Sequence, residues 1–186
     1  MSRLSRAGFV LAGGRSSRMG RDKAMLPLGG ETMLARIARL VENVAGSVAI
    51  LGPPDRYGAF GYPVIADQFA GCGPIAGIYS ALSFTTADWN LIVACDMPDL
   101  TPDLLEELFR AAAKSGADAS VPRSAAGLEP LCAVYHRRLA APAARAIDRK
   151  IFKMHDFLST LQLELVPVAD AAPLKNINTH AQWIAR

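Results

Sequence analysis

The stretch WNLIVACDMPDLTPDLLEELFRAAA, residues 89–113, carries the pattern that decides the fold. Its first six residues are almost entirely apolar, which is typical of a parallel strand covered on both faces. Thr101 can then cap a helix whose first residue would be Pro102. Apolar residues follow at helical spacing: Leu104, Leu105, Leu108, Phe109 and Ala112. The stretch therefore predicts a buried strand that leads into an amphipathic helix.

The same alternation of apolar runs and helical patterns continues in both directions. Further strands are predicted at residues 9–13, 47–51, 63–66, 117–122, 131–136 and 163–168. Helices are predicted from Met33 with Thr32 as the cap, at 73–83 with Pro74 at the start, at 139–148, at 156–161 and from Thr179. Residues 52–61 are expected to form a loop. This order predicts a three-layer αβα sandwich around a mostly parallel sheet, with residues 1–186 forming one domain.

Composition and charge exclude several classes of protein. A chain with 51% hydrophobic and 20% charged residues is globular, and a net charge of +3 is too small to indicate nucleic-acid binding. No apolar run approaches the ~18 residues that span a bilayer, and the run at 8–12 is shorter than the ~7–15 residues of a signal peptide. The cysteines have neither disulfide nor zinc spacing. We expect a cytoplasmic monomer that binds neither nucleic acid nor membranes.

The stretch LAGGRSSRMGRDKAMLPLGG, residues 11–30, follows the first predicted strand and combines glycines with cationic side chains. It matches neither the dinucleotide pattern GxGxxG nor the P-loop pattern GxxxxGK[ST]. Its chemistry nevertheless suits phosphate, because backbone N–H groups at Gly13 and Gly14 can approach an anion closely. Arg18 and Lys23 add positive charge. A solvated turn is the alternative, and the position at the carboxyl end of a strand favours the phosphate site.

Two aspartates end neighbouring predicted strands. Asp67 closes the strand at 63–66, and Asp96 follows the strand at 89–94, so both should emerge at the same edge as the glycine-rich stretch. Mg²⁺ is commonly held by one or two carboxylates together with phosphate oxygens. Asp96 is therefore a candidate metal ligand, although an aspartate before Met-Pro could also simply cap a turn. The basic run at 145–155 is either a solvated helix face or a second anionic site.

Four motifs together resemble the molybdenum cofactor guanylyltransferase family, within the sugar-nucleotide-transferase-like nucleotidyltransferases. They are LAGGRSSRMGRDKAMLPLGG, DQFAGCGPIAGI, LIVACDMPDL and KNINT, at residues 11–30, 67–78, 91–100 and 175–179. The resemblance implies a Rossmann-like nucleotidyltransferase fold and transfer of GMP from GTP to the terminal phosphate of molybdopterin, with release of pyrophosphate. It also implies Mg²⁺ as the cofactor and transient contact with molybdoenzymes or other cofactor-biosynthesis proteins.

The resemblance assigns roles to individual residues. Leu11, Ala12, Gly13, Gly14 and Asp67 would contact the nucleotide. The catalytic set would be Arg18, Lys23 and Asp96, of which Lys23 and Asp96 would also bind the nucleotide and Asp96 would hold the metal. The GPIAG segment would shape the pocket for base and ribose, and the NINT segment would lie on the molybdopterin side.

The chain departs from the family pattern at three places. LGPPD stands where an asparagine often follows the second strand, Thr179 is followed by His180 rather than proline, and a glycine is missing before the basic segment at 149–153. Because the glycine-rich stretch does not read the base, a cytidylyltransferase or an enzyme with another phosphorylated acceptor stays open. A non-catalytic GTP-binding module that delivers the cofactor is a further alternative.

Overall fold

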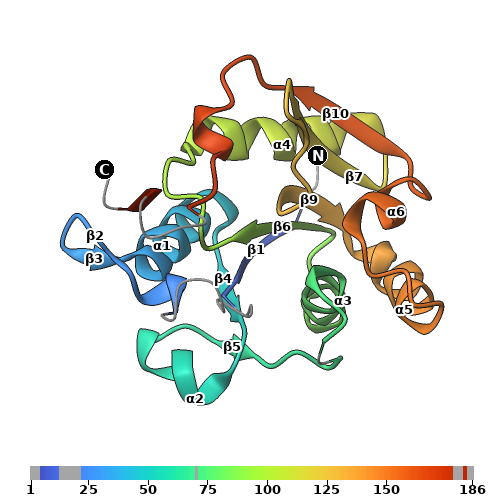
Figure 1. Ribbon diagram of the computed structural model, residues 1–186. Helices are drawn as coiled ribbons and strands as arrows, with labels where there is room; N and C mark the ends of the chain where they lie inside the picture. The colour runs from blue at the N-terminus through green and yellow to red at the C-terminus, as the bar shows by residue number, and fades with distance from the viewer. Residues whose placement is uncertain (1–4, 13–21, 70, 178–181, 184–186) are drawn as a thin grey trace.

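The computed structural model describes residues 5–12, 22–69, 71–177 and 182–183 (Figure 1). A central sheet has the strand order β10-β7-β9-β6-β1-β4-β5, with β8 paired to β7. The strands are β1 (Arg6–Leu11), β4 (Val48–Leu51), β5 (Val64–Ile65), β6 (Trp89–Ala94), β7 (Ala119–Ser124), β8 (Gly127–Leu128), β9 (Cys132–His136) and β10 (Leu163–Pro167). Strand β9 runs antiparallel to β6 and β7, and β8 runs antiparallel to β7, whereas the other pairs are parallel. The predicted mostly parallel sheet is confirmed.

Helices α1 (Met33–Ala45) and α4 (Pro102–Ser115) begin where their predicted capping residues place them. The other helices are α2 (Pro54–Tyr57), α3 (Pro74–Phe84), α5 (Ala140–Asp148) and α6 (Met154–Leu158), with 3₁₀ turns η1 (Lys23–Met25), η2 (Gly58–Phe60), η3 (Arg137–Leu139) and η4 (Ala172–Leu174). The Thr32 hydroxyl accepts a hydrogen bond from the Ala35 N–H at 3.2 Å, and Thr101 accepts one from Leu104 at 3.4 Å. Both predicted caps are confirmed.

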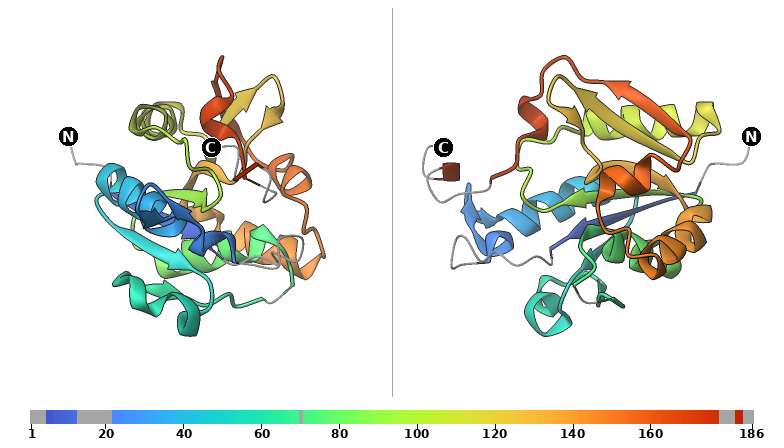
Figure 2. Two further views of the ribbon diagram at one scale, coloured as in Figure 1. Left: turned by 60° about the vertical axis from the view of Figure 1, so that its left-hand side comes forward. Right: turned by 45° about the vertical axis from the view of Figure 1, so that its right-hand side comes forward.

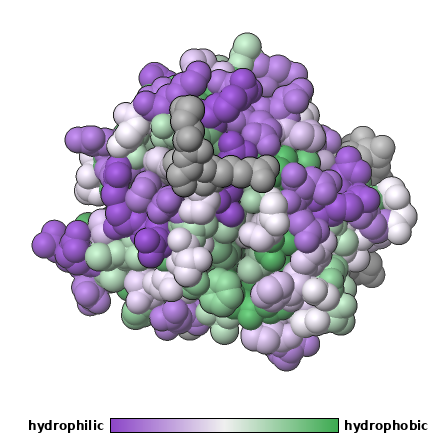
Figure 3. All heavy atoms as spheres, turned by 180° about the vertical axis from the view of Figure 1, so that it is seen from behind, coloured by the Kyte–Doolittle hydropathy of each residue, from purple (hydrophilic) through white to green (hydrophobic). Residues whose placement is uncertain are grey.

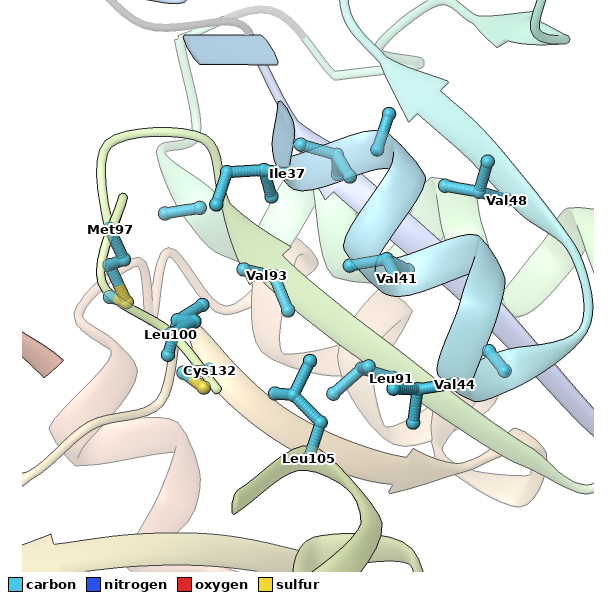
Figure 4. Packing of buried hydrophobic residues seen from close by; sticks show 14 of the residues in the cluster. Ile37, Val41, Val44, Val48, Leu91, Val93, Met97, Leu100, Leu105 and Cys132 are labelled. Atoms are coloured by element: carbon cyan, nitrogen blue, oxygen red, sulfur yellow. The ribbon is translucent and has the colours of Figure 1, made fainter. Parts of the chain in front are cut away.

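The apolar strands divide their side chains between two cores, which produces the three layers. In β6, Leu91 and Val93 point into the core beneath α1 and α4, whereas Ile92 points into the core beneath α3, α5 and α6. Figures 1 and 2 show the two sets of helices on opposite faces of the sheet. In Figure 4, residues of β6 interdigitate with Ile37 and Val41 of α1 and with Leu105 of α4. A strand covered on both faces is apolar along its length, which is why residues 89–94 form an almost continuous apolar run.

Two predicted boundaries are wrong. The segment 52–61, expected to be a loop, contains α2 and η2, and the helix expected at 156–161 is α6, which spans Met154–Leu158. Helices of four or five residues contain barely one turn, so their sequences carry no helical period, and packing decides where they form. The helix predicted from Thr179 begins outside the described residues, of which only Gln182 and Trp183 are helical there.

The end of α5 has an unusual residue in the left-handed conformation. Lys150 has φ +59°, and it is the one described non-glycine residue with positive φ. Its N–H donates to Ile147 O at 2.9 Å, and the Ile151 N–H donates to Ala146 O at 2.9 Å. These two bonds form a Schellman motif, in which the left-handed position is usually glycine. The side chain at Lys150 is therefore held in a conformation that costs free energy.

We expect Lys150→Gly to raise the free energy of unfolding by about 1 kcal/mol, because glycine adopts the left-handed conformation without steric cost. The measurement is the urea midpoint at an unchanged m-value. Lys153→Gly is the matched control, since Lys153 has φ −77° and glycine gains nothing there. An equal or larger gain from the control variant would contradict this account of Lys150.

The surface is mainly polar. Seen from behind, hydrophilic side chains cover much of the molecule, with smaller apolar areas toward the bottom of the view (Figure 3). The large hydrophobic side chains exposed among the described residues are Met25, Phe84 and Phe152. Within the ranges that the structure describes, no helix combines the length and apolar character needed to cross a bilayer.

Candidate functional site

The candidate site lies at the edge where β1, β4, β5 and β6 end. The Ala12 N–H donates to Leu51 O at 2.9 Å, and the Cys95 N–H donates to Leu11 O at 3.1 Å. These bonds continue the ladder one residue beyond the strands, so Leu11 and Ala12 lie between the ends of β4 and β6. In an open parallel sheet, ligands bind at this edge. The structure therefore brings the predicted residues Leu11 and Ala12 next to the segment that carries Asp96.

Lys23 and Asp96 form an ion pair at this edge. Lys23 begins η1, and Asp96 lies two residues after β6 ends, yet Lys23 Nζ lies 3.3 Å from Asp96 Oδ2. Each side chain is 19% exposed. The pair is thus largely shielded from water, and its electrostatic effect on an incoming anion or cation is screened less than at an open surface. Two residues that the sequence assigns to catalysis are adjacent in the fold.

Tyr57 links Ala12 and Asp22, two residues of the glycine-rich stretch that are separated by residues 13–21. The Tyr57 hydroxyl oxygen lies 2.7 Å from Ala12 O and 2.8 Å from Asp22 Oδ2, so its single proton serves two acceptors. Arg56 Nη1 lies 3.4 Å from the same carboxylate oxygen. Tyr57 is completely buried, and burial, together with the charge of Asp22, raises its pKa above the ordinary value. The hydroxyl therefore stays protonated and holds Ala12 and Asp22 together.

We expect Tyr57→Phe to lower the free energy of unfolding by about 1–3 kcal/mol, because a buried carbonyl and a carboxylate lose their shared donor. If residues 13–21 bind phosphate, the looser junction should also raise the KM for the nucleotide about tenfold, which corresponds to ~1.4 kcal/mol. Urea unfolding and steady-state kinetics measure the two effects. Tyr62→Phe is the control, since that hydroxyl makes an exposed contact of 3.4 Å with Glu42. Equal effects of both substitutions would contradict the proposed role of Tyr57.

Asp67 lies beside the start of α3. A Cβ added to Gly77 would lie 2.3 Å from Leu11 Cδ2 and 3.8 Å from Asp67 Oδ1, so Gly77 lets α3 approach both residues. The buried Ser80 hydroxyl donates to Ala76 O at 2.9 Å and accepts from the Gln68 N–H at 3.3 Å, which ties the residue after Asp67 to α3. Loss of hydration raises the pKa of Asp67. The GPIAG segment and Asp67 thus belong to the same edge as Leu11.

The C-terminal motif contacts the backbone of Asp96. The Ile177 N–H donates to Asp96 O at 2.8 Å, and Ile177 packs with Leu26 and Met33 in a small core. Asn176 Oδ1 is buried and accepts no hydrogen bond from the described part of the chain. A buried polar atom of this kind is a plain candidate for a ligand contact. The segment that follows, from residue 178, lies outside the described residues.

Two further titratable groups flank Asp96. Burial and the nearby charge of Asp96 raise the pKa of Glu129, whose carboxylate accepts from the Leu131 N–H at 3.4 Å. Burial, followed by the charge of Asp96, raises the pKa of Cys95 to about 12. The Cys95 thiol is therefore protonated at neutral pH and is a poor nucleophile. In the segments that the structure describes, no three His, Cys, Asp or Glu side chains gather closely enough to hold a metal by themselves.

The structure tests the position of only some of the predicted residues. Leu11, Ala12, Lys23, Asp67 and Asp96 all lie at the edge where the parallel strands end. The other predicted contacts, Gly13, Gly14 and Arg18, fall outside the described residues. Sequence reasoning missed Tyr57 and Glu129. Tyr57 lay in a segment taken for a loop, and no local pattern links it to Asp22, 35 residues away.

Comparisons with known proteins agree on one family. The family model described as MobA-like NTP transferase domain matches residues 8–164. A relative from Pelotomaculum thermopropionicum named "Probable molybdenum cofactor guanylyltransferase" is 35% identical over 94% of this chain and 84% of its own length. A relative from Synechococcus elongatus with the same name is 35% identical over 96% of both chains.

A solved structure leads to the same family. The molybdopterin-guanine dinucleotide biosynthesis protein A from Archaeoglobus fulgidus superimposes with a TM-score of 0.83 at 27% identity, covering 96% of this chain and 95% of the other. The expected three-layer nucleotidyltransferase fold is therefore confirmed.

Proposed function

Because this chain belongs to the family of MobA-like NTP transferase domains, we propose that it transfers GMP from GTP to the terminal phosphate of molybdopterin, forming molybdopterin guanine dinucleotide and pyrophosphate. The relatives named as molybdenum cofactor guanylyltransferases support the choice of GTP and molybdopterin. We also propose that residues 1–186 act as one nucleotidyltransferase domain, because both cores flank a single sheet.

The observation that carries the proposal is the Lys23–Asp96 pair beside Leu11 and Ala12. Its two atoms are 3.3 Å apart at the edge where nucleotides bind in open parallel sheets. A cation and an anion side by side suit a reaction centre that must hold both phosphate oxygens and a metal ion. A purely structural pair has no need to lie at this edge.

The chemistry requires alignment and charge neutralisation more than a protein nucleophile. An oxygen of the molybdopterin phosphate attacks the α-phosphorus of GTP, a new P–O bond forms, and the bond to the oxygen of the leaving pyrophosphate breaks. That phosphate is mostly ionised at neutral pH, since its second pKa is ~6, so no base is needed to activate it. The chain's own residues then position three groups and stabilise the charge that develops on them.

Each proposed residue has a part in that work. Lys23 binds the phosphates of GTP, and Leu11 and Ala12 line the nucleotide at the end of β1. Asp67, beside Gly77, contacts the nucleotide from the base and ribose side. Gly13, Gly14 and Arg18 would complete the phosphate contacts. Asn176, whose amide oxygen is buried without a described partner, would face the acceptor side.

We propose that the metal is Mg²⁺ and that Asp96 holds it. The donor set fits, because Mg²⁺ keeps several waters and takes one or two carboxylates together with substrate phosphates rather than a cluster of protein ligands. When bound, the ion would neutralise charge on the phosphate oxygens. Asp96 is placed for this by its backbone, whose carbonyl is fixed by Ile177.

Thermal unfolding with Mg²⁺ and each nucleotide in turn tests the choice of base. A ligand at 100 times its Kd adds ~2.7 kcal/mol, which shifts the Tm of a domain of this size by about 5–10 °C. We expect GTP to give such a shift and CTP and ATP to give little. A larger shift with CTP would instead support a cytidylyltransferase.

Release of pyrophosphate then distinguishes an enzyme from a binding module. We expect release from GTP only when molybdopterin is present. Binding of GTP without release in the presence of molybdopterin would identify a delivery module and overturn the proposal.

A further inference from the structure

A groove whose lining includes none of the predicted site residues runs between α5 and the segment that follows α6. Its cavity volume is about 520 Å³. Asp118 and Arg138 line one end, near the edge where β6 begins, because Trp89 at the start of β6 pairs with His136. The candidate site lies at the edge where β6 ends. The end of the groove at Asp118 and Arg138 therefore lies at the opposite end of the strands. The groove is of ligand-binding size and has no role in the proposed reaction.

One end of the groove is rigidly built. Arg138 Nε lies 2.9 Å from Asp118 Oδ1, and Arg138 Nη2 donates to Gly116 O at 2.9 Å and Ala117 O at 2.8 Å. The other oxygen of Asp118 accepts from the Gln162 N–H at 2.9 Å. The charge of Arg138 is therefore already compensated, and its guanidinium serves as a fixed wall.

The other two arginines of the groove are different. Arg145 and Arg149 are exposed and line the cavity; Arg145 lies in the last turn of α5, and Arg149, four residues on, is its C-cap. Neither has a carboxylate partner among the residues that the structure describes. Like charges at this spacing repel each other, although their place near the end of α5 suits the helix dipole. The cavity beside them is also lined by the apolar side chains of Ile151 and Leu161, which are partly exposed.

The backbone spacing of the two arginines matches that of an extended peptide, because the Arg149 N–H still donates to Arg145 O at 3.1 Å in the helical pattern. Residues four apart on a helix are ~6 Å apart along its axis, and alternate residues of an extended chain are ~6.6 Å apart. Acidic side chains at alternate positions can therefore meet Arg145 and Arg149 together. The side chain between them points the other way and can contact Ile151 and Leu161, the partly exposed apolar residues of the lining.

We propose that this groove docks an extended segment of a partner protein in which acidic residues alternate with apolar ones. The acidic residues pair with Arg145 and Arg149, and the apolar residue between them packs on Ile151 and Leu161. A peptide fits better than a compact anion, because the lining combines two exposed arginines with partly exposed apolar side chains, which a compact anion would leave uncovered.

Fluorescence anisotropy with the full chain tests the proposal. The probe is a labelled eight-residue peptide in which glutamate alternates with leucine. A peptide of the same composition with glutamates and leucines in pairs controls for charge and hydrophobicity. We expect the alternating peptide to bind at least ~10-fold more tightly than the paired one. We also expect Arg145→Glu with Arg149→Glu to weaken its binding at least ~10-fold.

The control variant is Arg110→Glu with Lys114→Glu. It makes the same change of charge at the same spacing on α4, which covers the other face of the sheet. It should bind the peptide like the unmodified chain. Arg145→Gln with Arg149→Gln removes the two charges without reversing them. If the glutamate variant does not fold, this neutral variant tests the same contact, and we expect it to bind the alternating peptide at least ~10-fold more weakly than the unmodified chain.

Three results would overturn the proposal. Equal losses of peptide affinity in the Arg145/Arg149 and Arg110/Lys114 glutamate variants would show that only net charge matters. Equal binding of the two peptides, or no binding at all, would rule out the spacing argument. Displacement of the peptide by pyrophosphate at micromolar concentration would identify a small-anion site.

Discussion

Asp96→Asn is expected to lower kcat by about 10³-fold while the chain remains folded. The substitution keeps the shape of the side chain and removes the negative charge that Asp96 would offer to Mg²⁺ in the proposed reaction. Loss of one preorganised charge at a reaction centre typically costs 10²–10³-fold in rate. The hydrogen bond from Ile177 goes to the backbone carbonyl, so it survives the substitution. Pyrophosphate release in the presence of molybdopterin measures the rate.

A second measurement separates the loss of metal from a loss of fold. GTP should no longer raise the Tm in a Mg²⁺-dependent way, although the Tm without ligand should change little. Asp103→Asn is the matched control, because Asp103 is an exposed carboxylate in the first turn of α4. Turnover above a tenth of the unmodified rate in the Asp96 variant would remove Asp96 from the catalytic set.

Lys23→Met is expected to lower kcat/KM by about 10²–10³-fold. Methionine keeps the apolar stem of the side chain and removes the ammonium group. In the proposed reaction this group binds GTP, and it binds more strongly as negative charge builds on the leaving pyrophosphate, so KM should rise and kcat should fall. Removing it also leaves Asp96 without the contact at 3.3 Å, which should modestly lower the Tm.

Lys23→Arg should recover little of that activity. Arginine has the charge, but its planar fork cannot follow a shifting phosphate charge as a compact ammonium does. Lys114→Met is the control, since Lys114 is exposed at the end of α4. A change in KM alone, with kcat intact, would restrict Lys23 to ground-state binding.

Strands covered on both faces were the most predictable part of the fold. Residues 89–94 are apolar because both faces are buried, and Thr101 and Pro102 place the start of α4 through local geometry alone. The direction of β9 was not predictable, because an antiparallel strand inside a covered sheet has the same apolar pattern as a parallel one. The short helix α2 depends on packing around Tyr57, which no local period records.

The candidate site was predictable where single segments carry the chemistry. Asp96 and Lys23 were identified because each follows a strand or a glycine-rich stretch, and the fold brings them within 3.3 Å. The contribution of Tyr57 depends on a contact across 35 residues, and that of Glu129 depends on burial near Asp96. Both are properties of the assembled edge and leave no mark on the neighbouring sequence. Lys150 was equally unpredictable, since lysine is an unusual residue for a left-handed position.

The hydrogen bond from Ile177 to Asp96 also sets an order in time. Ile177 is synthesised 177 − 96 = 81 residues after Asp96. At a ribosomal rate of ~5–20 residues per second, this delay is about 4–16 s. A nascent chain can pair β1, β4, β5 and β6 during that interval, but the carbonyl of Asp96 still lacks its donor. The edge that carries Asp96 is therefore completed late in synthesis, after the strands that form it.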